Sequence, residues 1–397
     1  MTVTPFSGNN PCDAWLSKFY GKMPFEDYLL LDRAARTLEG NVARGNKPWS
    51  PLRGIRPSCV IFPGIWNWDS AFHVLGVSRW NPELARDQIR ILCRLQQPSG
   101  LIPDVIFEDG RIMNRYGKPP VLPWAAAILE QRSPDPEFRA LCVAAFRRNE
   151  TFWRNSRTGK KIGLFHYDAD GETPEERFRD AKYESGWDNS VRWDNGISNL
   201  FAIDLNCYMV LFYRAMRILD PNPIWESREQ ELIRRIEETL WNETDQCYED
   251  RNMENGEFNG VITPASFMPL FIGSASPERA AAMAEIAEKH EMPGWPSVSY
   301  QNPNFDPEGY WRGRTWLNIA YFALKGLKNY GFDSLADRGR NTLLNWVRAV
   351  PGFLCENYHP VSGKPIGAAH FGWSAAFVIE FLLNWNSELP MAETRQK

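Results

Sequence analysis

Residues 69–96 read DSAFHVLGVSRWNPELARDQIRILCRLQ, and apolar residues recur at helical spacing on both sides of a two-residue break. This spacing predicts helices over 69–79 and 82–96. At the break, Asn81 is a favoured N-cap, Pro82 takes the first helical position, and Glu83 adds a negative charge to the first turn. Because the connection is only 80–81, the two helices must lie side by side and antiparallel. The stretch therefore predicts a helical hairpin.

The same pattern continues in both directions, while β-type alternation is scarce. Apolar spacing predicts further helices over 23–44, 119–131, 134–155, 196–218, 223–241, 263–272, 276–290, 312–330, 332–349 and 370–385. Ser276, Pro277 and Glu278 repeat the start signal of residues 81–83. Short connections (80–81, 132–133, 219–222, 273–275 and 331) alternate with long ones (45–68, 97–118, 156–195, 242–262, 291–311 and 350–369). Strict alternation implies six antiparallel hairpins, with every long connection at one end of the molecule.

The fold class that fits is all-α: a closed (α/α)6 barrel of six helical hairpins with long loops at one end. We expect one catalytic domain over residues 1–397, with loop excursions at about 97–118 and 156–195 over the active-site end. Three stretches that follow outer helices, 153–168, 241–258 and 355–367, contain turn residues and predict small hairpins. The alternative is an irregular or solenoid helical protein, but no strict sequence repeat supports a solenoid.

Composition excludes several function classes. The 397 residues carry a net charge of −4, with 43% hydrophobic and 24% charged residues, so no nucleic-acid partner is expected. No run reaches the roughly 18 apolar residues of a membrane span, and the first residues contain no signal-peptide pattern. The seven cysteines are scattered singly, which predicts reduced thiols and a cytoplasmic location. We expect no metal and no cofactor, because the histidines form no HExxH pair and the acidic run 167–172 does not match an EF-hand loop. The oligomeric state is left open.

The unusual feature is the aromatic content, with 17 Trp, 23 Phe and 13 Tyr. Most Trp-rich and Gly-rich stretches fall in or beside the long connections, at 63–70, 184–195, 310–316, 355–358 and 371–374. Tryptophan offers a flat apolar face and one N–H donor, and a pyranose ring has an apolar C–H face rimmed by hydroxyls. A rim of Trp, Asp, Asn and Arg therefore predicts a small-molecule carbohydrate substrate, although any single Trp can equally pack between helix ends.

Glycoside hydrolysis needs two carboxyl groups, one to protonate the leaving oxygen and one to activate water or attack carbon. Five carboxylates stand in the rim segments: Asp69, Glu184, Asp188, Asp194 and Glu356. Three of them lie beside helix starts, where a capping role is the alternative. The residues alone do not select the catalytic pair.

The stretches PGIWNWDSAFH, ESGWDNSVRWDN, YWRGRTW and ENYHPVSGKPIG…FGWSAA resemble the motifs of glycoside hydrolase family 63 over about residues 60–385. The most similar branch is that of the short bacterial mannosylglycerate and glucosylglycerate hydrolases. The resemblance implies an inverting α-glycosidase that releases terminal glucose or mannose from a small glycoside, with Asp188 as general acid and Glu356 as general base. It also implies substrate contacts from Trp66, Trp68, Asp69, Trp187, Asn189, Arg192, Trp311, Arg312, Trp316, Tyr358 and Trp373.

Two departures concern the leaving group. Related hydrolases tend to have SQPPLLAW-like and WRGPVW-like stretches, whereas this chain has Lys118 and Arg314 there. Both cations are expected near the rim, where they either attract an acidic leaving group or face solvent. Three alternatives remain open: a trehalase-like hydrolase, a sugar epimerase using His73 and His370 as opposed bases, and a non-catalytic sugar-binding protein.

Overall fold

The computed structural model describes residues 10–159, 161–167, 171–196, 199–289 and 294–387. Its helices match the predicted positions closely. They are α1 (Pro11–Leu16), α2 (Phe25–Gly40), α3 (Asn67–Val77), α4 (Pro82–Arg94), α5 (Leu122–Arg132), α6 (Pro136–Ser156), α7 (Pro174–Ser185), α8 (Ile203–Leu219), α9 (Ile224–Thr239), α10 (Met268–Phe271), α11 (Pro277–Lys289), α12 (Leu317–Asn329), α13 (Asp333–Ala349) and α14 (Gly372–Leu383), with 3-10 turns η1 (Val191–Gly196) and η2 (Pro264–Phe267).

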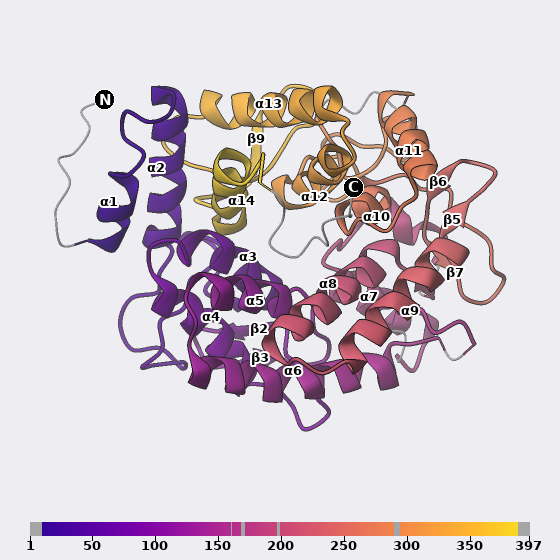
Figure 1. Cartoon of the computed structure of the whole chain (residues 1–397), viewed down its shortest axis with the longest axis horizontal. Coiled ribbons are helices and arrows are strands. Elements are labelled where there is room, and N and C mark those ends of the chain that lie inside the picture. Colours follow the sequence, from indigo (N-terminus) through magenta and orange to yellow (C-terminus); the bar gives the residue numbers. More distant parts are fainter. Residues whose placement is uncertain (1–9, 160, 168–170, 197–198, 290–293, 388–397) are drawn as a thin grey trace.

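Six helical segments form a closed inner ring, in which η2 and α10 follow each other directly and count as one segment. Helix α3 contacts α5, α5 contacts α8, α8 contacts η2 and α10, α10 contacts α12, α12 contacts α14, and α14 returns to α3. The outer helices α2, α4, α6, α9, α11 and α13 surround this ring (Figure 1). The contact of α14 with α3 closes the circle, so the fold is an (α/α)6 barrel rather than a solenoid.

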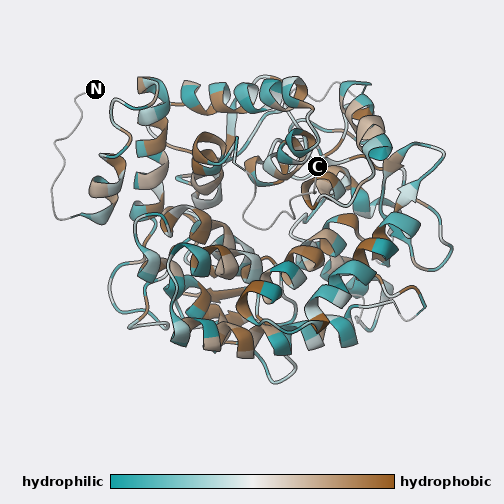
Figure 2. Cartoon of the chain, viewed as in Figure 1, coloured by the Kyte–Doolittle hydropathy of each residue, from teal (hydrophilic) through white to brown (hydrophobic). Residues whose placement is uncertain are grey.

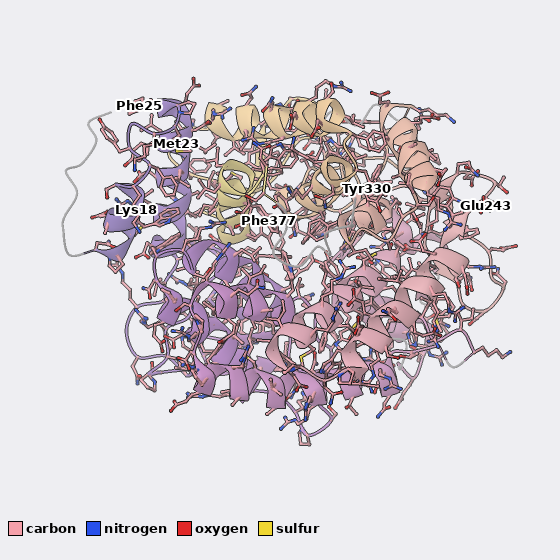
Figure 3. The ribbon with its side chains drawn as sticks, in the orientation of Figure 1. Lys18, Met23, Phe25, Glu243, Tyr330 and Phe377 are labelled. Atoms are coloured by element: carbon pink, nitrogen blue, oxygen red, sulfur yellow. The ribbon has the colours of Figure 1, made fainter. Side chains whose placement is uncertain are left out.

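Hydrophobicity explains which helix of each pair lies inside. All of α3 is buried, as is almost all of α8, whereas α9 and α13 bury a single stripe of residues. Figure 2 shows hydrophilic residues on the ribbons of α9 and α13 at the periphery. The ring of Phe377, on α14, is fully buried in the interior, while Glu243 projects at the edge (Figure 3).

The predicted start signals form as expected. The Asn81 side chain accepts a hydrogen bond from the Leu84 N–H (3.1 Å), and the Ser276 hydroxyl accepts one from the Arg279 N–H (3.2 Å). Long connections (41–66, 95–121, 157–202, 240–263, 290–316 and 350–371) alternate with short ones, as predicted. No helix in the described part of the chain is long and apolar enough to cross a membrane.

The strands are short and lie in the long connections. One sheet has the order β1 (Gly64–Trp66), β2 (Val105–Phe107), β3 (Ile112–Met113), and all its pairs are antiparallel. Two-stranded pairs join β4 (Leu200–Phe201) to β7 (Arg251–Asn252), β5 (Trp241–Asn242) to β6 (Cys247–Tyr248), and β8 (Cys355–Tyr358) to β9 (Pro365–Ala369). The predicted hairpins within 241–258 and 355–367 are thus present, and 153–168 contains a Thr158–Phe165 bridge.

Two helices were not predicted. Helix α7 stands inside the connection that was expected to be loop over 156–195, and α1 precedes the barrel. The start of α7 carries a full capping box, in which the Thr173 hydroxyl accepts from the Glu176 N–H and the Glu176 carboxylate accepts from the Thr173 N–H. Only a few of its residues are apolar, so the periodicity signal is weak.

Candidate active site

A pocket opens among the long connections. Its space, including the opening to solvent, is about 460 Å³. Half-buried Phe62, Trp66, Asp188 and Tyr310 mark the mouth. The buried residues that complete the lining are Pro57, Trp68, Asp69, Lys118, Gly186, Trp311, Glu356, Phe371 and Trp373. Seven of the sequence-predicted site residues therefore face one pocket: Trp66, Trp68, Asp69, Asp188, Trp311, Glu356 and Trp373.

Asp188 stands in the short turn between α7 and η1. Gly186 ends α7 with φ +75°, and a Cβ there would lie 2.8 Å from the Trp68 ring, so only glycine fits. The next residue, Asn189, accepts a hydrogen bond from the Trp311 N–H (2.8 Å), which ties the turn to the connection before α12. Burial raises the pKa of the Asp188 carboxyl, and the positive charge of Lys118 opposes that rise.

A buried ion cluster next to this turn holds it in place. Arg192 donates to both oxygens of Asp204 and to both oxygens of Asp250, at 2.7–2.9 Å. Its guanidinium also lies 4.9 Å from the ring centre of Trp187, which in turn packs on Trp311. Arg192 and Trp187 thus lie outside the pocket lining and hold the segment that carries Asp188.

Glu356 belongs to strand β8 and is 4% exposed. Its Oε1 accepts from the Tyr310 hydroxyl (2.5 Å), and its Oε2 accepts from the Ala368 N–H (3.1 Å) on the partner strand β9. Burial raises the pKa of Glu356, and these two hydrogen bonds oppose the rise because they favour the ionised form. Gly367 lies against the same carboxylate, with φ +77° and a would-be Cβ 2.6 Å from Oε2.

Asp69 and Lys118 also line the pocket, and Asp104 is paired with Lys118. Asp69, in the first turn of α3, is 3% exposed, and burial together with nearby Asp104 and Glu356 raises its pKa well above the usual range. Burial raises the pKa of Asp104 to about 6, and Lys118 opposes that rise. The Lys118 Nζ lies 3.6 Å from Asp104 Oδ2 and donates to the Tyr183 carbonyl oxygen.

Tryptophans form the floor of the pocket. The rings of Trp311 and Trp316 stack in parallel with centres 3.8 Å apart, and Trp316 meets Trp373 edge-on at 5.6 Å. Trp68 contacts Trp311 at 6.3 Å and Trp373 at 5.3 Å. Trp316 lies behind Trp311 and does not line the pocket, while its indole N–H donates to the Tyr310 carbonyl oxygen (3.2 Å).

Other predicted residues do not line the pocket. Arg312 forms a two-pronged ion pair with Asp194 (2.7 and 2.8 Å) and donates to the Asn189 carbonyl oxygen. The Tyr358 hydroxyl is buried and accepts from the Cys355 N–H. Glu184 is fully buried and bonded to Arg157 (2.9 Å). Arg314 donates to the Glu308 carbonyl oxygen rather than lining the pocket.

The pocket also contains residues that the sequence reasoning did not select. Tyr310 directly precedes Trp311 in a quoted motif, so its neighbourhood was a usable signal. Phe62 and Phe371 likewise adjoin motif residues. Asp104 does not line the pocket and had no such signal, because its importance comes from its pairing with Lys118 and its charge near Asp69.

The remaining predictions concern histidines and metals. His73 is fully buried with both ring nitrogens unpaired, burial lowers its pKa to about 3, and neither His73 nor His370 lines the pocket. Within the described ranges no group of three or more His, Cys, Asp or Glu side chains is placed to hold a metal. Asp168, Ala169 and Asp170 of the acidic run lie outside the described residues.

Residues 62–374 match the family model described as the mannosylglycerate hydrolase MGH1-like glycoside hydrolase domain. The chain belongs to this family. The family 63 resemblance is confirmed, and the protein is a glycoside hydrolase. Among its relatives in the family, the mannosylglycerate hydrolase of Thermus thermophilus is 26% identical over 408 residues, covering 81% of this chain and 95% of the relative. The glucosylglycerate hydrolase of Mycolicibacterium hassiacum is 24% identical over 452 residues, covering 89% and 97%.

Solved structures of similar proteins agree with the barrel fold. The crystal structure of the GH63 mannosylglycerate hydrolase from Thermus thermophilus in complex with glucose aligns with a TM-score of 0.72 and 25% identity, over 89% of this chain and 100% of that one. The neutral trehalase Nth1 from Saccharomyces cerevisiae aligns with a TM-score of 0.69 and 18% identity, over 89% and 80%. The trehalase likeness concerns the fold alone.

Proposed function

We propose that the protein is an inverting α-glycosidase in which Asp188 is the general acid and Glu356 the general base. The observation that carries the proposal is that these two carboxyls, from connections far apart in the sequence, line one Trp-walled pocket. Inverting glycosidases use two carboxyls roughly 6.5–9.5 Å apart with a water between them.

The hydrogen bonds around each carboxyl support the division of roles. Glu356 accepts from Tyr310 and from the Ala368 N–H, and both bonds stabilise its ionised form. In the described part of the chain, no side chain donates a hydrogen bond to the Asp188 carboxyl. Burial holds the pKa of Asp188 above the usual range, which favours its protonated form. Protonated Asp188 donates to the glycosidic oxygen, while ionised Glu356 takes a proton from the water that attacks the anomeric carbon.

The substrate is a small glycoside with a terminal α-linked glucose or mannose, either of the glucosylglycerate and mannosylglycerate type or an α-glucobiose. The names of the relatives, mannosylglycerate hydrolase and glucosylglycerate hydrolase, support this class. Asp69 holds sugar hydroxyls, and the indoles of Trp68, Trp311 and Trp373 face the ring. The excursions 97–118 and 156–195 supply Lys118, Gly186 and Asp188 and cover the leaving-group side.

The seven free cysteines support a cytoplasmic location, where thiols stay reduced. The epimerase alternative gains no support, because the two histidines that it requires do not line the pocket. A single catalytic domain over 1–397 is part of the proposal.

The experiment is a hydrolysis panel of glucosylglycerate, mannosylglycerate, trehalose, kojibiose and nigerose. We expect turnover of at least one, and losses of roughly 10²–10⁴-fold in Asp188→Asn and Glu356→Gln. Asp194→Asn is the matched control, because Asp194 lies in the same connection but is paired with Arg312 and does not line the pocket. Full activity in either catalytic variant would overturn the proposal. Turnover of trehalose alone would favour the trehalase-like alternative.

A further inference from the structure

One residue of the pocket lining, Lys118, forms a charge pair with Asp104 that the acid–base mechanism does not use. Lys118 and Asp104 are 9% and 6% exposed, and their Nζ and Oδ2 atoms lie 3.6 Å apart. Lys118 is the only cation that lines the pocket among the described residues, and it shares that lining with Asp69, Asp188 and Glu356. A buried ammonium is costly unless it is paired and hydrogen-bonded. The contacts that hold Lys118 therefore show what its ammonium can still bind.

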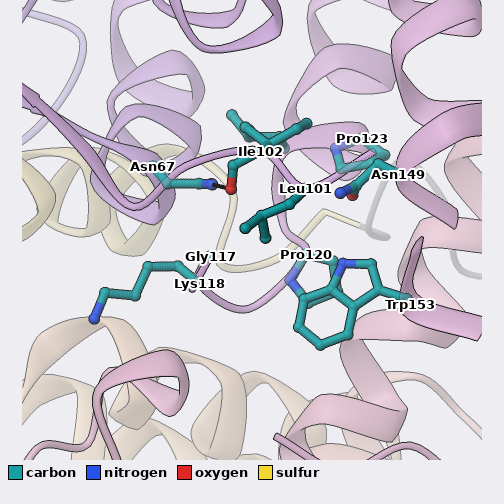
Figure 4. Close-up of a pocket in the computed structure, with 10 residues that line it drawn as sticks. Asn67, Leu101, Ile102, Gly117, Lys118, Pro120, Pro123, Asn149 and Trp153 are labelled. Carbon is teal, nitrogen blue, oxygen red and sulfur yellow. Dashed lines mark hydrogen bonds between the residues drawn. The ribbon is translucent and has the colours of Figure 1, made fainter. Parts of the chain in front are cut away.

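The surroundings of Lys118 fix its ammonium at the pocket wall. Residues 115–118 are joined to α7 by a continuous seam: Arg115 bonds Asp180 (2.6 and 2.9 Å), the Tyr116 ring stacks on Tyr183, and the Gly117 N–H donates to Glu184. A smaller cavity lies on the other side of the same segment, lined by residues such as Pro120 and Trp153. Lys118 lines both spaces, and Figure 4 shows its side chain extending away from Asn149 and Trp153 of the smaller one.

The donor count leaves one N–H for a ligand. An ammonium has three N–H donors and no acceptor. One donates to the Tyr183 carbonyl oxygen and one faces Asp104. Apart from the two catalytic carboxyls, the charged side chains of the lining are Asp69 and Lys118. A sugar that stacks on the tryptophans therefore meets one carboxyl and one ammonium besides the Tyr310 hydroxyl and the indole N–H groups.

We propose that Lys118, held by Asp104 and the Tyr183 carbonyl, is a sugar-binding residue that donates a charge-assisted hydrogen bond to one ring hydroxyl of the glycone. This assignment rests on the proposed function only in taking the pocket as a sugar site. It differs from the rim position expected from the sequence, because the ammonium is buried and already paired with a carboxylate rather than free to attract an acidic leaving group.

The test measures binding of free sugars, so it does not require turnover. Dissociation constants are measured by calorimetry for D-glucose and D-mannose and for their 2-, 3-, 4- and 6-deoxy forms. The variant is Lys118→Met combined with Asp104→Asn, because removing Lys118 alone would leave a buried carboxylate unpaired. Asp104→Asn alone keeps the ammonium. Lys182→Met is the matched control, since Lys182 is also near Asp188 but lies over the Phe178 ring instead of lining the pocket.

In the wild type and in Lys182→Met, we expect one deoxy analogue to bind roughly ten- to a hundred-fold more weakly than its parent sugar. In the double variant, we expect this analogue to bind as tightly as its parent sugar. The other deoxy analogues should still bind more weakly than the parent, as they do to the wild type. Asp104→Asn retains the discrimination. An unchanged deoxy pattern in the double variant, or no measurable sugar binding by the wild type, would overturn the assignment.

These outcomes separate this inference from the proposed function. A protein that shows the expected deoxy pattern but hydrolyses no glycoside would refute the proposed activity and leave the role of Lys118 standing. A protein that hydrolyses a glycoside with an unchanged deoxy pattern in the double variant would refute the role of Lys118 alone. Melting temperatures of all variants exclude unfolding as the cause of lost binding.

Discussion

The hydrogen bond between Tyr310 and Glu356 predicts how the activity depends on pH. The Tyr310 hydroxyl donates to Glu356 Oε1 at 2.5 Å, while burial raises the pKa of the same carboxyl. Tyr310→Phe removes the donor and leaves the ring in place. A hydrogen bond to a charged group contributes about 1.5–3 kcal/mol, and 1.36 kcal/mol corresponds to one pKa unit. The pKa of Glu356 is therefore expected to rise by about one to two units in the variant.

The direction in which the pH profile shifts follows from the role of Glu356 as a base. A base acts when ionised, so activity is lost as pH falls through its pKa, and a higher pKa moves this acidic limb to higher pH. We expect the acidic limb of kcat/KM for the best substrate of the panel to move up by about one to two units in Tyr310→Phe. At pH values above the limb, the rates of wild type and variant should converge to within a few-fold.

The matched control is Tyr300→Phe. Tyr300 is also partly buried, but its hydroxyl donates to the Pro360 carbonyl oxygen (2.7 Å) and bonds no carboxylate. Its removal should leave the acidic limb in place. An unmoved limb in Tyr310→Phe, or a uniform loss of rate at every pH, would refute the reasoning that Tyr310 acts by stabilising the Glu356 carboxylate.

Two further variants test the supports of the two carboxyls. Arg192→Met leaves Asp204 and Asp250 buried without their cation, so we expect a loss of about 3–5 kcal/mol in unfolding free energy by urea denaturation. A wild-type midpoint would show that the cluster contributes little. Gly367→Ala places a Cβ 2.6 Å from Glu356 Oε2, so kcat should fall at least about ten-fold. Gly352→Ala shares a positive φ (+87°) but has open space around it, so it should cost about 1–2 kcal/mol of stability at most and leave kcat unchanged. Equal kcat losses in both glycine variants would contradict the contact argument.

The helices were predictable because each carries its signal locally. The spacing of apolar residues, together with caps such as Asn81 and Ser276, located the twelve barrel helices, and the alternation of connection lengths gave their pairing. Helix α7 was missed because its capping box at Thr173 and Glu176 is followed by a mostly charged segment. Propensity and caps were present there, but the apolar periodicity that usually identifies a helix was not.

The site was predictable only in part, because some of its contacts join segments that are far apart in the sequence. Asp188 and Glu356 stand in stretches that resemble the motifs of a known family, and both line the pocket. The contacts of Tyr310 with Glu356 and of Asp104 with Lys118 join segments whose relative position depends on the closed barrel. Arg312 and Arg192 show the converse. Their motifs marked them as pocket residues, but neither lines the pocket; Arg312 is paired with Asp194, and Arg192 is paired with Asp204 and Asp250.

The stereochemistry of hydrolysis tests the central claim most directly. Proton NMR follows the first anomer released from the best α-linked substrate, with Asp188→Asn and Glu356→Gln as inactive controls. Direct inversion by a water activated by Glu356 predicts that the β-anomer appears first and that the α-anomer grows later by mutarotation. Initial release of the α-anomer would indicate a covalent intermediate and would contradict the role of Glu356 as general base.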